Sequence, residues 1–81
     1  GGMNIQTARA AIVEEVERAA NLHPDWPTDI IHAVAIMAEE SGEAVKAAVN
    51  LVYGGGSETE LREELIHTAA TCIRCLVEND L

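Results

Sequence analysis

Apolar residues recur every three or four positions in the first part of the chain, from about Asn4 to Leu22. This is the spacing of one face of an α-helix. The apolar face consists of Ala8, Ile12, Val16 and Ala19. Four charged residues lie off this face, and we expect them to face solvent: Glu14, Glu15, Glu17 and Arg18.

A second helical stretch is expected from about Thr28 to Tyr53. The segment HPDWPTD separates it from the first helix, because two prolines and two aspartates disfavour a continuous helix. The second stretch is apolar on most sides, and a helix of that kind is usually packed against neighbours on several faces. We therefore expect it to be the central helix of the fold.

A third helix is expected from Ser57 to about Glu78. The glycines of GGGS at 54–57 end the second helix, and Ser57 with Glu60 matches the capping-box pattern of a new helix. Its predicted buried stripe is Leu61, Leu65, Ala69, Cys72 or Ile73, and Leu76. No segment alternates as a β-strand would. The predicted fold is all-α: a three-helix unit with a long central helix, completing a helical bundle by oligomerisation.

The small size of the chain is the main reason to expect oligomerisation. We interpret residues 1–2, both glycine, as an expression scar and residues 3–81 as a single helical domain. A chain this short hides only about 60% of its unfolded surface on folding. Yet 48% of its residues are apolar, so much of that surface would stay in water. We expect a homodimer or homotetramer.

The net charge of −9 limits the classes of partner. Nucleic acids and anionic membranes are bound through clustered Lys and Arg, and only 5 basic residues stand against 14 acidic ones. We expect neither partner, and instead expect some acids to bind cations. No apolar run approaches the roughly 20 residues that span a bilayer. The sequence also begins without a leader pattern, so a cytoplasmic location is expected.

The two cysteines, Cys72 and Cys75, form a CxxC pair within a helical pattern. No strand precedes the pair, as it would in a thioredoxin-type motif, and one pair cannot complete a zinc site alone. We interpret both cysteines as small apolar residues that pack within the helix bundle.

Three glutamates interrupt the apolar second helix: Glu39, Glu40 and Glu43. Residues three or four apart share one face of a helix, so all three can lie in one patch. Ionised carboxylates that crowd together away from water repel each other, unless they bind a proton or a cation. Because carboxylate oxygens suit Mg²⁺ or Mn²⁺, the pattern predicts a divalent metal site.

The third helix carries a matching stripe of Glu60, Glu64 and His67. A short turn joins the second and third helices, so they must run antiparallel. Counted from that turn, Glu43 and Glu64 lie at similar distances, and we expect them to face each other. The two helices would then present several carboxylates and one imidazole to a single cation.

The sequence EESGE, followed by REELIH, resembles the EExxE and ExxD signature of the MazG-like, all-α nucleoside triphosphate pyrophosphohydrolases. The similarity covers residues 26–75, including the glycine turn. One departure is that His67 stands at the aspartate position of ExxD. His67 could be a metal ligand, a hydrogen-bond partner of the substrate, or the mark of a weakened site, because neutral imidazole is a poor Mg²⁺ ligand.

This resemblance implies hydrolysis of nucleoside or deoxynucleoside triphosphates to the monophosphate and pyrophosphate. The implied cofactor is Mg²⁺, or Mn²⁺, and it would lower the pKa of the water that attacks the α-phosphorus. The implied metal ligands are Glu40, Glu43, Glu64 and His67. The predicted catalytic residues are Glu39, Glu40 and Glu43, with Glu39 orienting the water or accepting its proton. Lys46 could bind a phosphate, and Trp26 could stack on a base.

Two other functions remain open. Glu64-x-x-His67 is also the motif of di-iron and di-manganese carboxylate bundles, and a dimer would supply the required number of ligands by symmetry. The chain could instead be a non-catalytic helical module whose acids bind a basic partner.

Overall fold

The computed structural model describes residues 2–81 and contains three α-helices: α1 (Ile5–Leu22), α2 (Ile30–Tyr53) and α3 (Glu58–Glu78). All regular secondary structure in this range is helical. The predicted all-α class and the three predicted helices are therefore confirmed.

Each helix begins with a side chain that caps it. Asn4 Oδ1 accepts a hydrogen bond from the Thr7 N–H at 2.8 Å, and Asp29 Oδ1 accepts one from the His32 N–H at 2.8 Å. Ser57 Oγ accepts one from the Glu60 N–H at 3.1 Å, which is the first half of the predicted capping box. These bonds satisfy N–H groups that have no acceptor within the helix, and so fix where each helix starts.

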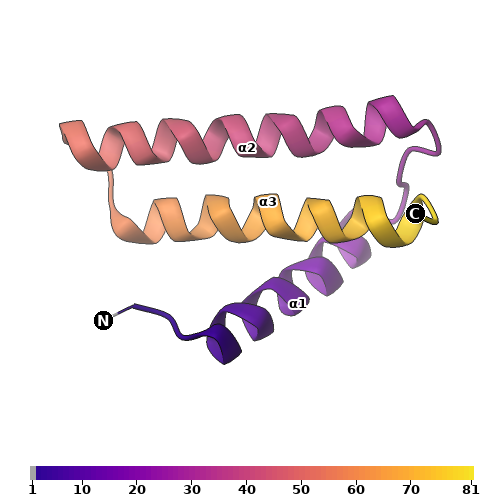
Figure 1. Ribbon diagram of the computed structural model, residues 1–81, viewed down its shortest axis with the longest axis horizontal. Coiled ribbons are helices and arrows are strands. Elements are labelled where there is room, and N and C mark those ends of the chain that lie inside the picture. The colour runs from indigo at the N-terminus through magenta and orange to yellow at the C-terminus, as the bar shows by residue number, and fades with distance from the viewer. Residues whose placement is uncertain (1) are drawn as a thin grey trace.

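The helix in the middle of the chain's fold is α3, not α2 as predicted. α2 and α3 run antiparallel side by side, and α1 crosses α3 on its other side (Figure 1). α3 packs against both neighbours, while the backbones of α1 and α2 do not come into contact. α2 is apolar on most sides, but the single chain covers only one of them.

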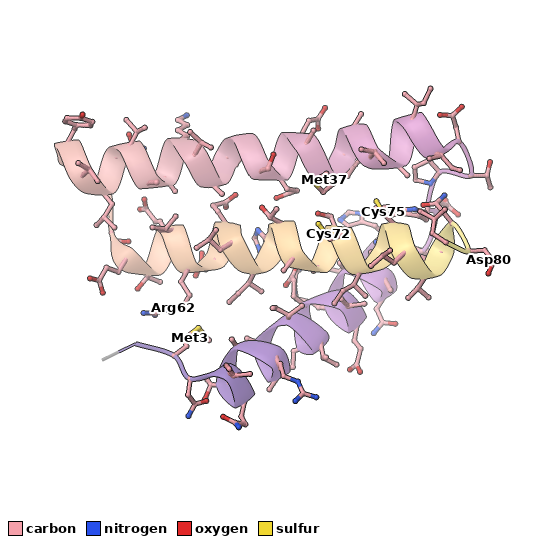
Figure 2. The ribbon with its side chains drawn as sticks, viewed as in Figure 1. Met3, Met37, Arg62, Cys72, Cys75 and Asp80 are labelled. Carbon is pink, nitrogen blue, oxygen red and sulfur yellow. The ribbon has the colours of Figure 1, made fainter. Side chains whose placement is uncertain are left out.

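The interface between α2 and α3 is built from small residues. The buried apolar residues are Ala33, Ala44 and Ala47 on α2, and Ala70 and Cys75 on α3. The Cys75 thiol lies 3.5 Å from the Ala33 carbonyl oxygen, its hydrogen-bond acceptor. Met37 and Cys75 both lie between the two helices (Figure 2). Side chains this small allow the two helix backbones to approach closely.

The predicted buried stripe of α3 is partly confirmed, since Leu61, Ala69 and Ile73 are half-buried, but it is wrong at its other positions. Leu65 and Leu76 are 54% and 55% exposed, and Cys72 is exposed as well. The buried residues of α3 are Ala70, Arg74 and Cys75. Spacing alone favoured the leucines, but α3 turns its small residues toward its neighbours. Of the two cysteines, only Cys75 packs inside as expected.

The loop before α2 is fastened to the last turns of α3. Arg74 is only 4% exposed, lies 4.5 Å from the centre of the Trp26 ring, and donates a hydrogen bond to the His23 carbonyl at 2.9 Å. The Trp26 indole N–H donates to Asn79 Oδ1 at 2.8 Å, and Asn79 Nδ2 donates to the Pro27 carbonyl at 3.0 Å. A buried guanidinium held by these contacts is costly to disturb.

The turn between α2 and α3 depends on its glycines. Gly54 and Gly55 have φ angles of 103° and 90°, which side chains disfavour. Gly56 has no room for a side chain, because an added Cβ would lie 2.8 Å from backbone atoms of Asn50 and Leu51. The Gly56 N–H also donates to the Asn50 carbonyl at 3.2 Å, so the backbone is held in this position.

Among residues 2–81, no helix is both long enough and apolar enough to cross a membrane.

We expect Gly56→Ala to destabilise the protein by about 1–3 kcal/mol, because the new methyl group would collide with backbone that cannot move freely. The free energy of unfolding from urea denaturation, monitored by circular dichroism, tests this. Thr59→Ala, at an exposed position nearby, should change that energy by no more than about 0.5 kcal/mol. Equal effects of the two changes would contradict the crowding at Gly56.

Candidate metal centre

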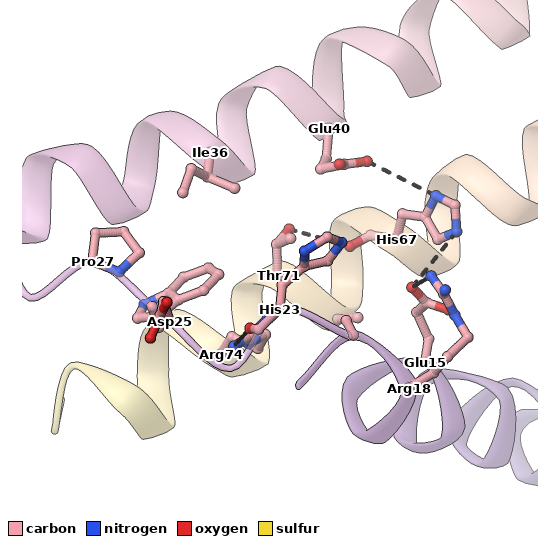
Figure 3. Close-up of a pocket in the computed structure, with 13 residues that line it drawn as sticks. Glu15, Arg18, His23, Asp25, Pro27, Ile36, Glu40, His67, Thr71 and Arg74 are labelled. Carbon is pink, nitrogen blue, oxygen red and sulfur yellow. Dashed lines mark hydrogen bonds and ion pairs between the residues drawn. The ribbon is translucent and has the colours of Figure 1, made fainter. Parts of the chain in front are cut away.

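Three side chains from α2 and α3 converge on one point. Glu40, Glu64 and His67 each offer a ligand atom, and the three atoms lie within 4.8 Å of one another. His67 Nδ1 is 3.9 Å from Glu40 Oε2 and 3.7 Å from Glu64 Oε1. Figure 3 shows Glu40 pointing from α2 toward the imidazole of His67 on α3. The predicted convergence of helix 2 and helix 3 residues is therefore present.

The two carboxylates of this cluster lack hydrogen-bond donors. Glu40 Oε2 and Glu64 Oε2 are both buried and have no hydrogen-bond partner. Their side chains are only 29% and 23% exposed. A buried oxygen without a donor is destabilising, and a cation or a proton is the usual remedy.

The pKa values of Glu40 and Glu64 are both raised. Burial is the largest cause for each carboxyl group. The nearby carboxyl group of Glu43 raises the pKa further at both Glu40 and Glu64. His67 acts in the opposite direction on both pKa values. Each group therefore binds a proton more readily than an ordinary glutamate does, and a bound cation would relieve the same unfavourable charge.

A fourth residue, Glu15, joins the cluster from α1. Its Oε2 atom lies 3.7 Å from His67 Nε2, on the other side of the ring from Glu40 (Figure 3). Arg18 donates two hydrogen bonds to Glu15, at 2.7 and 2.6 Å, and these lower the pKa of Glu15. The expectation that Glu15 faces solvent is therefore wrong, since its side chain is only 14% exposed. No local pattern in the sequence indicates that α1 crosses α3 at this level.

Of the other predicted site residues, some adjoin this cluster and others lie apart from it. Glu43 is largely exposed but adjoins Glu64, as the antiparallel pairing predicted. Lys46 lies in a shallow hollow with Glu43, Glu60 and Glu64. Glu39 is exposed and takes no part in the three-residue cluster.

A cleft of about 330 Å³ opens beside the cluster. Glu40, His67 and Glu15 line one part of it (Figure 3). Trp26 also lines the cleft. This volume is at the lower end of the range for small-molecule sites. Trp26 is therefore placed to contact a molecule in the cleft, although its indole N–H and one ring face are already engaged by Asn79 and Arg74.

The donor set suits a hard divalent cation. Two carboxylates without donors and one imidazole can each supply one ligand atom, and Glu43 adjoins them. Carboxylate oxygens suit Mg²⁺ and Mn²⁺, and the imidazole shifts the preference toward Mn²⁺.

Comparisons of the chain with protein-family models, with curated proteins and with solved structures found no match.

The raised pKa values predict how stability depends on pH in the metal-free protein. Because the folded state holds protons on Glu40 and Glu64 more tightly than the unfolded chain, their contribution to stability is full below the ordinary pKa of 4.5. It is lost as the pH rises through their raised values. Urea denaturation in a chelating buffer, repeated at successive pH values, should show the free energy of unfolding falling over this interval.

Glu40→Gln should reduce that pH dependence and raise the stability of the metal-free protein near pH 7, because the amide carries no charge to bury. Glu39→Gln, at the exposed neighbouring position, is the matched control and should leave the slope unchanged. A slope that is the same in the wild-type protein and in Glu40→Gln would rule out Glu40 as its source.

Proposed function

We propose that this protein is a metal-dependent hydrolase that converts nucleoside or deoxynucleoside triphosphates to the monophosphate and pyrophosphate. The observation that carries the proposal is the grouping of Glu40 and Glu64, each with one buried oxygen that has no hydrogen-bond partner, around His67 beside a cleft that Trp26 lines. The resemblance of EESGE and REELIH to the MazG-like signature supports the same chemistry.

In this proposal the cation is held by Glu40, Glu64 and His67, with Glu43 as a further ligand. A divalent cation supplies neutralisation of phosphate charge and lowers the pKa of a coordinated water. The neutralisation is needed here, because a protein of net charge −9 would otherwise repel a polyphosphate.

The hollows on either side of the carboxylates suggest how the substrate lies. The cleft with Trp26 adjoins Glu40 and His67, and the hollow with Lys46 adjoins Glu43 and Glu64. A nucleoside in the cleft would bring its α-phosphate to the cluster. The β- and γ-phosphates would then extend toward Lys46, whose ammonium group can pair with them.

Hydrolysis requires a water, a proton acceptor and a leaving group. The water oxygen forms a bond to the α-phosphorus as the bond to the bridging oxygen of pyrophosphate breaks. Glu43 would take the proton released by the water through the carboxylate oxygen that does not bind the cation, because it adjoins the cluster but is more exposed than Glu40. Glu15 is a poorer base, since Arg18 holds its pKa low. Glu39 would need to move to assist, because it lies outside the cluster.

The test is to incubate the protein with each nucleoside and deoxynucleoside triphosphate in Mg²⁺ or Mn²⁺ and to quantify pyrophosphate and monophosphate. We expect activity with at least one triphosphate, greater in Mn²⁺ because of His67. Glu64→Gln should reduce turnover at least about 100-fold through loss of a ligand, and Glu43→Gln should abolish it. Glu17→Gln, an exposed change on α1, is the control and should retain activity.

Metal binding gives a second measurement that does not depend on turnover. Mn²⁺ should raise the melting temperature of the wild-type protein and much less that of Glu64→Gln. No cleavage of any triphosphate in either metal would refute the proposed reaction. Bound iron, with an absorbing centre after purification, would favour the di-metal carboxylate alternative. If the protein shows neither cleavage nor a metal response, the non-catalytic helical module is the remaining alternative.

A further inference from the structure

The side of α2 that faces away from α3 is apolar along its whole length. The residues at its centre are Ile31, Ala35, Ala38, Gly42, Val45, Val49 and Val52, and all seven are exposed. Ile31, Val45 and Val52 are 82%, 64% and 74% exposed. We call these seven residues the outer stripe. Nothing in the described chain covers it, since α2 lies at one edge of the fold (Figure 1).

The spacing of the outer stripe is that of a coiled coil. Its members alternate at intervals of four and three residues, which is the a/d pattern of a heptad repeat. At 1.5 Å of rise per residue the stripe is about 30 Å long. The exposed side of an ordinary surface helix is polar, and a continuous apolar stripe of this length indicates a helical partner.

The outer stripe is complementary to itself when two copies run antiparallel. Its small residues, Ala35, Ala38 and Gly42, all lie in one half, and its valines, Val45, Val49 and Val52, all lie in the other. A two-fold axis between Glu43 and Ala44 places each small residue opposite a valine. The facing pairs are Ala35 with the partner's Val52, Ala38 with the partner's Val49, and Gly42 with the partner's Val45. Parallel chains in register would instead set glycine against glycine and leave a gap.

Charge selects the same arrangement. Glu39 and Lys46 are seven residues apart along one edge of the outer stripe, and both are exposed. In the antiparallel register above, Glu39 lies beside the partner's Lys46, and the symmetry repeats the pair. Sliding the helices by one heptad would set Glu39 beside the partner's Glu39. Charges at such flanking positions determine orientation and register in coiled coils.

We infer that the occupant of the outer stripe is a second copy of this chain, and that the protein is a dimer joined through antiparallel α2 helices. A surface that is complementary to itself about a two-fold axis is what an isologous dimer requires. Glu40 lies on the α3 side of α2, so dimerisation leaves both carboxylate clusters accessible. Lys46 also lines the hollow beside Glu43, so association rather than turnover is the measurement that tests the dimer separately from the proposed hydrolysis.

Sedimentation velocity over a range of concentrations tests the dimer, which we expect to dissociate at least tenfold more readily in Val45→Glu. Val45 is exposed in the single chain, so the variant can still fold. Glu17→Lys, at an exposed position on α1, should leave association unchanged. A wild-type protein that is monomeric at every concentration, or a dimer that Val45→Glu does not weaken, would overturn the inference.

A charge exchange tests the register. Glu39→Lys and Lys46→Glu should each weaken the dimer, because each sets like charges beside each other twice. The double variant Glu39→Lys/Lys46→Glu should restore association toward the wild-type value. If the double variant loses as much association free energy as the two single variants combined, the register is wrong.

Disulfide crosslinking tests the orientation in a Cys72→Ser background, which removes the exposed native thiol. A mixture of Ala35→Cys and Val52→Cys chains should form mixed crosslinks. Neither chain should crosslink to itself, because an antiparallel pair offsets identical residues by about 25 Å at 1.5 Å per residue. Self-crosslinking without mixed products would show parallel helices and would overturn the antiparallel arrangement.

Discussion

The close contact between α2 and α3 over alanines determines most of what this small fold does. Ala33, Ala44 and Ala47 meet Ala70 and Cys75, and side chains of this size hold the two helices near each other. Large side chains at these positions would separate the helices and admit water between them. The same closeness places Glu40 against His67 and leaves carboxylate oxygens without hydrogen-bond donors. The thin apolar core and the crowded carboxylates are therefore two results of one packing arrangement.

That arrangement has an energetic cost that the fold must offset elsewhere. Among residues 2–81, no large side chain is fully buried, so the hydrophobic stabilisation of one chain is modest. Burial also raises the pKa values of Glu40 and Glu64, so that their ionisation opposes folding near neutral pH. A divalent cation and a second subunit would relieve different parts of this cost. The cation would neutralise the carboxylates, and the subunit would cover the exposed valines of α2.

Much of the secondary structure could be predicted because its signals are local. Prolines in the loop after α1, glycines after α2 and capping side chains each act within a few residues of a helix end. The pairing of α2 with α3 could also be predicted, because a short turn allows only antiparallel neighbours. The position of α1 could not be predicted, since the contacts that set it join residues far apart in the sequence. Glu15 was missed for that reason, and the buried side of α3 was misplaced because α3, rather than α2, lies between two neighbours.

The hydrogen bonds that hold the loop before α2 also affect the carboxylate cluster around His67. Trp26, Arg74 and Asn79 hold residues 23–27 against the end of α3, and α1 enters directly into that loop. The direction of α1 is thus set at one end of the molecule, whereas Glu15 meets His67 two turns back along the helix. Asn79 makes no hydrogen bond to the carboxylate cluster. By holding the loop, it nevertheless helps to set the position of α1, and so whether the charge of Glu15 lies beside His67. Variation at the last turn of α3 could consequently tune the electrostatic environment of His67 from a distance, through the angle at which α1 leaves the loop.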